Sequence, residues 1–200
     1  KKQSGFQVIF GPVRAKDIPA FLKNNRTADP GMRQVTFDLY DRFILTPVEI
    51  QIILKPALIT ALVVLLLSGI GPEIFSLSSA WEKGRIGLLA LASGIVSGAV
   101  FTPVLLPYIP VKAFALKGLI IGAPSAFITL LLAPSSSVGA SGTAALFLFS
   151  ITVSSFLAMN FTGSTPFTSP SGVEKEMKHY IPVQLATLLL SFGLWMYSAF

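Results

Sequence analysis

The residues with the greatest capacity for acid–base chemistry lie between positions 174 and 179. His179 follows Glu174, Glu176 and Lys178, and an imidazole beside carboxylates can transfer protons. No serine in a nucleophile elbow accompanies it, so the pattern favours a solvated histidine in a loop. The chain has one histidine and no cysteine, which excludes a disulfide, a thiolate metal site or a cysteine nucleophile within these residues.

A cluster of hydroxyl side chains overlaps the start of this stretch. It also contains Gly163 and Gly172, and this composition is typical of turns. The cluster could bind a phosphate group or pack against a soluble domain. Alternatively, it forms a capped turn in which Ser171 starts a short interfacial helix at about residues 172–180. The hydroxyl residues are Thr162, Ser164, Thr165, Thr168, Ser169 and Ser171.

The composition places the chain in the membrane class. Hydrophobic residues make up 52% of the 200 residues, charged residues make up 12%, and the mean hydropathy is +0.73. The net charge is +6, and nine of the fifteen lysines and arginines lie in residues 1–55, with five acidic residues. This segment has no arginine–aromatic run and no glycine-rich RNA motif. We therefore expect it to face the anionic inner leaflet and not a nucleic acid.

Five apolar segments are long enough to cross a hydrocarbon core of about 30 Å, which takes about 20 residues. Positive charge near their ends gathers in the N-terminal segment, at Lys112 and Lys117, and at Lys175 and Lys178. The positive-inside rule therefore predicts a multi-pass inner-membrane protein with a cytoplasmic N-terminal segment and Phe200 outside. The predicted helices are about 48–70, 86–108, 114–133, 143–161 and 181–200.

Polar chemistry is sparse inside these spans. We expect Lys117 to reach the interface from a span end, and no ionisable side chain falls at mid-membrane, which disfavours a proton-coupled carrier. Pro103, Pro107 and Pro124 predict kinks or opened backbone bonds in the second and third spans. Small residues that predict close helix packing are Ser93, Gly94, Ser97 and Gly98 in the second span and Gly118 and Gly122 in the third.

The N-terminal segment reads as part of an α/β unit. Residues 5–10 are β-branched and aromatic and end at Gly11-Pro12, which predicts a short strand and a turn. A helix should follow Asp17 and end at Asn24. Residues 35–47 predict a strand or extended chain. Because these elements bury too little apolar surface to fold alone, we expect the rest of the sheet to lie upstream or in a partner.

Four stretches of the chain are similar to a known family: residues 5–22 (GFQVIFGPVRAKDIPAFL), 41–50 (DRFILTPVEI), 109–118 (IPVKAFALKG) and 159–177 (MNFTGSTPFTSPSGVEKEM). They resemble the C-terminal part of the HgcA family, the membrane corrinoid protein of mercury methylation. That family is related to the large subunit of the corrinoid iron–sulfur protein. The resemblance implies a mainly α fold of about five transmembrane helices (48–200), preceded by the last strand-helix-strand portion of an α/β corrinoid-binding domain (1–47).

The resemblance also implies a function. The full-length protein would be a corrinoid-dependent methyltransferase that passes a methyl group via cobalt to inorganic mercury, Hg(II), giving methylmercury. The corrinoid (a cobalamin-type cofactor) would be bound mainly by an upstream domain, and the cobalt-ligating cysteine is absent from this chain, so the chain alone should be inactive. A ferredoxin-like partner with 4Fe–4S clusters would reduce the cobalt. Residues expected to face the corrinoid are Gly11, Pro12, Val13, Arg14, Thr46 and Pro47.

Two other functions remain open from the residues. A small-solute transporter is favoured by the prolines in the second and third spans and disfavoured by the lack of a buried charge. A purely structural membrane anchor requires no site of its own, and it is compatible with the methyltransferase reading.

Overall fold

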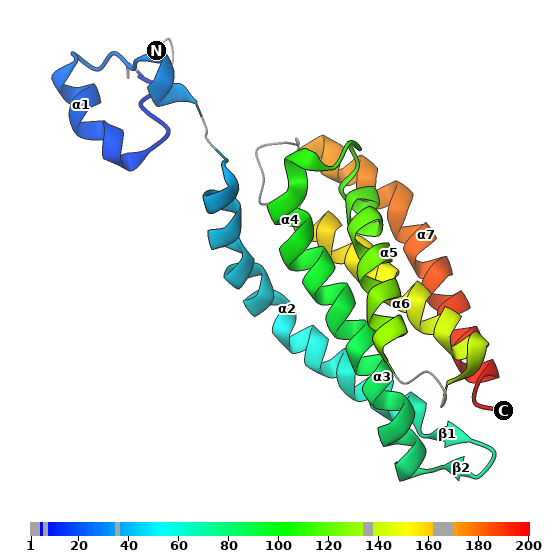
Figure 1. The fold of residues 1–200 in the computed structure, drawn as a ribbon. Helices are drawn as coiled ribbons and strands as arrows, with labels where there is room; N and C mark the ends of the chain where they lie inside the picture. The colour runs from blue at the N-terminus through cyan, green and yellow to red at the C-terminus, as the bar shows by residue number, and fades with distance from the viewer. Residues whose placement is uncertain (1–4, 6–7, 35–36, 134–137, 162–169) are drawn as a thin grey trace. The chain divides into compact units, whose positions relative to one another are not determined.

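The computed structural model describes residues 5, 8–34, 37–133, 138–161 and 170–200. The chain divides into two compact units, Lys1–Asp38 and Leu39–Phe200, and each is described by itself (Figure 1). The boundary lies nine residues before the one expected at residue 47, because the first long helix begins at Leu39.

The first unit is built from short helical elements. These are η1 (Ala15–Asp17), α1 (Ile18–Lys23) and η2 (Pro30–Arg33). The helix expected after Asp17 is confirmed, and it ends at Asn24, after which Asn25 and Arg26 adopt positive φ angles of 49° and 59°. The strand expected at residues 5–10 is absent from the described part, since residues 8–10 have no neighbouring strand to accept their backbone bonds.

The second unit contains five helices that are long and apolar enough to cross a membrane. The expected five spans are therefore confirmed, and the chain is a multi-pass membrane protein. The helices are α2 (Leu39–Ser68), α3 (Leu77–Val96) with its continuation to Tyr108, α5 (Phe114–Leu132), α6 (Gly139–Asn160) and α7 (Pro170–Tyr197).

Two boundaries differ from those expected. The strand or extended chain expected at residues 35–47 is wrong from Leu39 onward, because α2 continues through Pro47 and Pro56. Membrane helices tolerate proline where the freed backbone groups find other partners. The separate interfacial helix expected at residues 172–180 is also wrong, because α7 runs unbroken from Pro170.

The second span begins at Leu77, earlier than expected, and its helix type changes along its length. A two-stranded ribbon of β1 (Ile70–Gly71) and β2 (Ile74–Phe75) precedes α3. Near its other end the span passes through a π-helical turn, η3 (Ser97–Phe101), then α4 (Thr102–Leu105) and η4 (Leu106–Tyr108). The Thr102 hydroxyl donates to the Ser97 carbonyl at 2.8 Å. The backbone opening expected from the prolines of this span is thus present.

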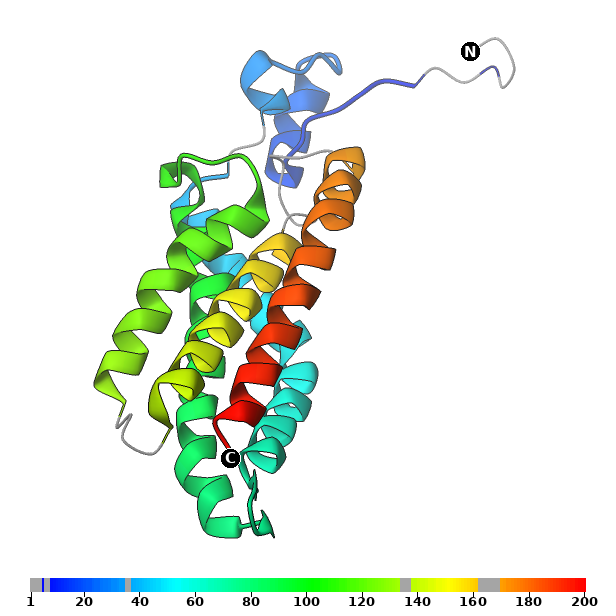
Figure 2. The same cartoon turned by 90° about the vertical axis from the view of Figure 1, so that its right-hand side faces the viewer.

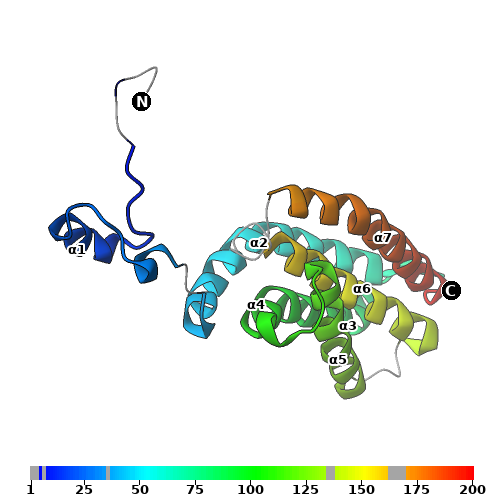
Figure 3. The ribbon, with the colours of Figure 1, turned by 90° about the horizontal axis from the view of Figure 1, so that it is seen from above.

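Helix α6 is the centre of the bundle, with α5, α7 and α3 packed around it (Figure 3). Small residues allow this contact. A Cβ atom on Gly118 would lie 2.6 Å from the Ser154 carbonyl oxygen, and one on Gly94 would lie 2.7 Å from that of Ser150. The packing role expected for these glycines is confirmed.

The two ends of the bundle are distinct (Figures 1 and 2). The first residues of α2, α5 and α7 and the last residues of α6 lie at one end, which we call the junction end. The β1–β2 ribbon and the C-terminus lie at the opposite end, where a Cβ atom on Gly71 would be 3.6 Å from the Ala199 carbonyl oxygen. Five crossings therefore place Leu39 and Phe200 on opposite sides of the bundle.

The glycine contact predicts a pair of contrasting stabilities. Gly118→Ala should destabilise the protein by about 1–3 kcal/mol, because the added methyl group meets backbone atoms that cannot move aside. Gly193→Ala is the matched control, since nothing lies within 4 Å of a Cβ atom there. Thermal unfolding in detergent should show a lower midpoint for Gly118→Ala alone. Equal midpoints for the two variants would contradict the close α5–α6 contact.

Candidate functional site

The first feature of the junction end is a cap on α5 supplied by another helix. The backbone N–H of Ala115 donates to Glu176 Oε1 at 2.7 Å. The N-cap residue Ala113 makes no side-chain cap, so the first N–H groups of α5 need an outside acceptor. A carboxylate suits this position because it also interacts favourably with the positive end of the helix dipole. Glu176 therefore ties α7 to α5.

The second feature is a lysine that points into the protein. Lys117 Nζ donates to the Leu106 carbonyl at 2.7 Å and to the Ile109 carbonyl at 3.2 Å, and the residue is 8% exposed. These carbonyls belong to the end of the second span and the loop that follows. Lys117 thus lies near span ends as expected, and its ammonium group binds carbonyls of the protein there.

The residues expected to face a corrinoid fall into both units. In the first unit, Gly11 has the Phe21 ring on one side, with 3.7 Å between the ring and an added Cβ atom. Val13 donates its N–H to the Met32 carbonyl at 2.8 Å, and Arg14 precedes η1 with extended backbone angles. Pro12 lies between Gly11 and Val13 and is half-buried.

The other two expected residues belong to α2 in the second unit. Thr46 is buried, and its hydroxyl is 3.4 Å from the Arg42 carbonyl, whereas Pro47 is exposed. The structure thus brings Gly11 to Arg14 together as one loop and places Thr46 and Pro47 on one helix. A role for either group towards a corrinoid stays a prediction.

The loop from Gly11 to Arg14 offers limited surface to a ligand such as a corrinoid: Gly11 is exposed and Val13 is 53% exposed, whereas Pro12 and Arg14 are half-buried. The cysteine ligand for cobalt that the resemblance implies is absent from this chain.

The other candidates from the sequence are His179 and the hydroxyl cluster. His179 lies on α7, not in a loop, and it is exposed, with its ring 5.0 Å from that of Tyr180 in an edge-on arrangement. Within the hydroxyl cluster, Ser171 and Gly172 belong to the first turn of α7. The cluster residues Thr162, Gly163, Ser164, Thr165, Thr168 and Ser169 lie outside the described residues.

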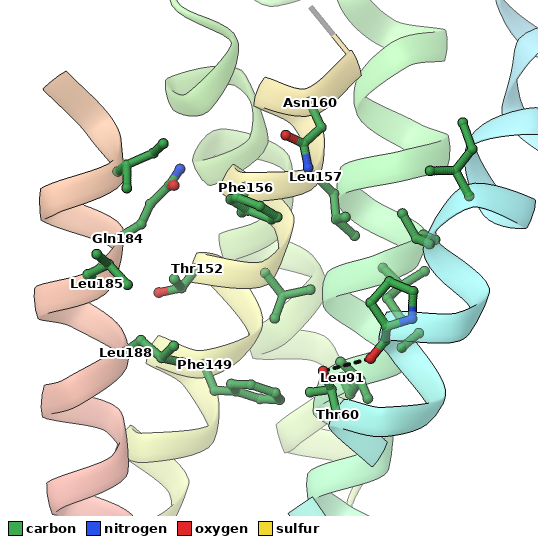
Figure 4. A pocket seen from close by; sticks show the side chains of 17 residues that line it. Thr60, Leu91, Phe149, Thr152, Phe156, Leu157, Asn160, Gln184, Leu185 and Leu188 are labelled. Atoms are coloured by element: carbon green, nitrogen blue, oxygen red, sulfur yellow. Dashed lines mark hydrogen bonds between the residues drawn. The ribbon is translucent and has the colours of Figure 1, made fainter. Parts of the chain in front are cut away.

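A lateral groove lies between α2 and α7 in the second unit (Figure 4). It forms because α2 packs chiefly on α3, whereas α7 packs on α6. The upper cleft has a volume of about 460 Å³, and a second cleft of about 330 Å³ shares Thr60, Phe149 and Leu188 with it. The upper cleft is lined mainly by apolar side chains, and its polar lining residues are Thr60, Thr152, Asn160 and Gln184.

Sequence reasoning missed Gln184, which is 8% exposed beside this groove. The Gln184 Nε2 group donates to the Ser155 hydroxyl at 2.9 Å, and Oε1 has no partner among the described residues. The available signal was an amide within the apolar run of the fifth span. Asn160, the most polar residue noted near a span end, is exposed.

Comparison of the chain with protein-family models, with curated proteins and with solved structures finds no match.

The cap on α5 predicts a stability difference between two neighbouring glutamates. Glu176→Ala should cost about 1–3 kcal/mol, because it leaves a partly buried N–H without an acceptor. Glu174→Ala is the matched control. Its carboxylate makes an exposed ion pair with Lys178 at 2.6 Å, and such surface pairs contribute little. Hydrogen exchange of the Ala115 amide should accelerate in Glu176→Ala only, and unchanged exchange would contradict the cap.

Proposed function

We propose that this chain is the membrane-anchoring half of a corrinoid-dependent methyltransferase that passes a methyl group via cobalt to Hg(II). The observation that carries the proposal is the contact between two stretches that resemble the HgcA family. Glu176 of residues 159–177 accepts a hydrogen bond from Ala115 of residues 109–118, across 61 positions of sequence. Because of this hydrogen bond, both stretches contribute to the same contact between α5 and α7 at the junction end.

The first unit supports the proposal through its exposed apolar surface. Val8, Phe10 and Val13 are 76%, 80% and 53% exposed, and Phe21 is the one buried hydrophobic residue in the described part of this unit. A unit of this size with so small a core needs another protein surface against it. An upstream corrinoid domain would provide that surface by pairing with the extended residues 8–10.

The chemistry would be divided between the cofactor and the protein. The corrinoid, held mainly by residues outside this chain, would supply methyl transfer at cobalt, and a ferredoxin-like protein with 4Fe–4S clusters would keep the cobalt reduced. The residues of this chain would do two things. The loop from Gly11 to Arg14 would line the rim of the cofactor site, and α2 would tie that domain to the membrane.

Close packing favours an anchor over a solute transporter. The helices α3, α5 and α6 meet through glycines whose missing side chains bring backbones into contact, for example Gly98 and Gly118 against Ser154. These backbone contacts leave no room for a solute between α3, α5 and α6. A purely structural anchor is compatible with this proposal, because the membrane helices would anchor the corrinoid domain that carries out the reaction.

The orientation is part of the proposal. The junction end has Lys112 in the loop before α5 and Lys175 near the start of α7, and it continues into the basic first segment. At the opposite end, Glu73 of the ribbon and Glu82 of α3 balance Lys83 and Arg85 of α3. By the positive-inside rule, the junction end would lie in the cytoplasm and Phe200 outside the inner membrane.

The methyltransferase proposal predicts a bound corrinoid in the complete gene product. The experiment reads the coding sequence upstream of Lys1 and purifies the encoded protein from its native membrane without oxygen. We expect an upstream domain with a cobalt-ligating cysteine, the visible absorbance of a corrinoid, and transfer of labelled methyl groups to Hg(II). Substituting that upstream cysteine with alanine is the matched control and should abolish transfer.

Two results would overturn the proposal. The first is a coding sequence that starts near Lys1 together with no corrinoid absorbance when a separately encoded soluble domain is supplied. The second is a corrinoid protein that transfers methyl groups to another acceptor and never to Hg(II), which would retain the cofactor and exclude mercury as substrate.

The orientation predicts the behaviour of reporter fusions. Alkaline phosphatase fused after Phe200 should be active, because it folds only outside the cytoplasm, and a fusion in the loop after Leu132 should also be active. A fusion in the loop after Asn160 should be inactive. Activity after Asn160 with none after Phe200 would reverse the topology.

A further inference from the structure

The end of the bundle opposite the junction end carries a group of large exposed apolar side chains. The β1–β2 ribbon and the first turns of α3 extend beyond the neighbouring ends of α5 and α6 (Figures 1 and 2). We call residues 70–85 the ribbon projection. Because a cluster of exposed apolar side chains marks a contact surface, the projection calls for a partner. The side chains are Ile74 (85% exposed), Phe75 (48%), Leu77 (80%) and Trp81 (66%).

Ile74, at the tip of the projection, has a backbone conformation that β-branched residues avoid. Its φ angle is 67°, and the Phe75 N–H donates to the Glu73 carbonyl at 2.8 Å, which closes a three-residue turn around it. Glycine or asparagine adopts such an angle more readily than isoleucine. Packing within the chain does not offset this strain, because the side chain is 85% exposed. An isoleucine at the tip therefore calls for apolar surroundings outside the chain.

The ribbon and the start of α3 are joined by packing and hydrogen bonds. The Phe75 ring packs directly on Gly69, and the Ser76 N–H donates to the Gly69 carbonyl at 2.9 Å. The Ser76 hydroxyl also caps α3, since it accepts from the Ser79 N–H at 3.4 Å. The tip and the first turns of α3 therefore form one continuous surface.

This surface continues along α3 into the membrane span. Arg85 is followed by an uncharged run that ends at Val111, and a long cationic side chain at the end of a span reaches towards the interface. Leu77 and Trp81 therefore lie just past the hydrocarbon boundary, on the side of α3 that faces lipid within the span. A stripe of exposed residues at intervals of three or four makes this connection: Leu77, Trp81, Arg85, Leu89, Ala92 and Val96.

The headgroup layer of a bilayer suits the projection in depth and in charge. This layer adds about 5–8 Å on each side of the hydrocarbon core. Trp81 precedes Arg85 by four residues, or about 6 Å of helix, and tryptophan is enriched in this layer. Leu77 lies one turn further along, so it enters the layer only if the projection leans onto the bilayer. The two acidic and two basic residues of the projection balance, so no net charge selects anionic lipids.

We propose that the ribbon projection is an interfacial anchor that lies in the headgroup layer of the bilayer, with Ile74, Leu77 and Trp81 inserted among the lipids. Its partner is a phospholipid surface, which it binds through apolar side chains and not through charge. The anchor sets the depth of α2 and α3 at the end opposite the junction end. This inference needs only the five spans and does not rest on the methyltransferase proposal.

The test exploits the absence of cysteine from the chain, which allows single nitroxide labels. Leu77→Cys and the matched control Glu82→Cys are labelled, and the full chain is placed in phosphatidylcholine nanodiscs. Both positions are exposed, so neither label displaces a packed side chain. Collisions with oxygen, which concentrates in lipid, and with a water-soluble nickel chelate report the surroundings. The ratio of oxygen to nickel collisions should be several-fold higher for the Leu77 label than for the Glu82 label.

A second variant tests the role of the tip. Ile74→Asn removes the apolar side chain, and asparagine tolerates the positive φ angle, so the turn keeps its shape. In the Leu77→Cys protein, this change should lower the oxygen-to-nickel ratio to that of the Glu82 label. Glu73→Gln, the matched control at the neighbouring position, should leave the ratio unchanged.

Four results would overturn the proposal. Equal ratios at the two labelled positions would place the projection in water. Shielding of the Leu77 label from both reagents would indicate a protein contact, and dipolar broadening with two copies in each nanodisc would identify a second copy. A ratio that survives Ile74→Asn would mean that helix packing alone sets the depth. A high ratio that requires anionic phosphatidylglycerol would replace apolar insertion by charge attraction.

Discussion

The second unit of this protein is governed by the need to satisfy backbone polar groups where water is scarce. Three departures from regular helix in it are closed by side chains. Thr102 covers the carbonyl released by the π turn, Lys117 covers carbonyls after the second span, and Glu176 covers an N–H at the start of α5. Because the bonds of Lys117 and Glu176 join different segments, the same constraint that permits the irregular backbone also fixes the junction end.

The same constraint explains the hydroxyls of the bundle core. Ser154 donates to the Gly118 carbonyl and Ser191 donates to the Ala145 carbonyl, each at 2.7 Å and each across a helix contact. Such bonds require backbones to approach closely, which the glycines of α3 and α5 allow. At the contact between α5 and α6, close packing and a hydrogen bond therefore act together, and α2 remains outside this contact.

The sequence contained enough to predict the five spans, because uninterrupted apolar length is a local property. It was insufficient at Leu39, where proline at position 47 suggested a boundary that the helix passes through. It was also insufficient for Lys117 and Glu176, whose partners are carbonyl and N–H groups of other segments. Those contacts depend on how helices pack, and no spacing along the chain encodes them. Gln184 could have been noticed as an amide in an apolar run, but its missing partner is visible only in three dimensions.

Helix α2 is held in the bundle through its C-terminal half. Cβ atoms on Gly84 and Gly87 of α3 would lie 2.7 and 2.6 Å from Leu65 and Val64 in this half. The same half supplies most of the α2 residues that line the groove, from Pro56 to Leu67. The contact with α3 and the lining of the groove therefore belong to one half of the helix, whereas the half that contains Pro47 is the one that continues into the first unit.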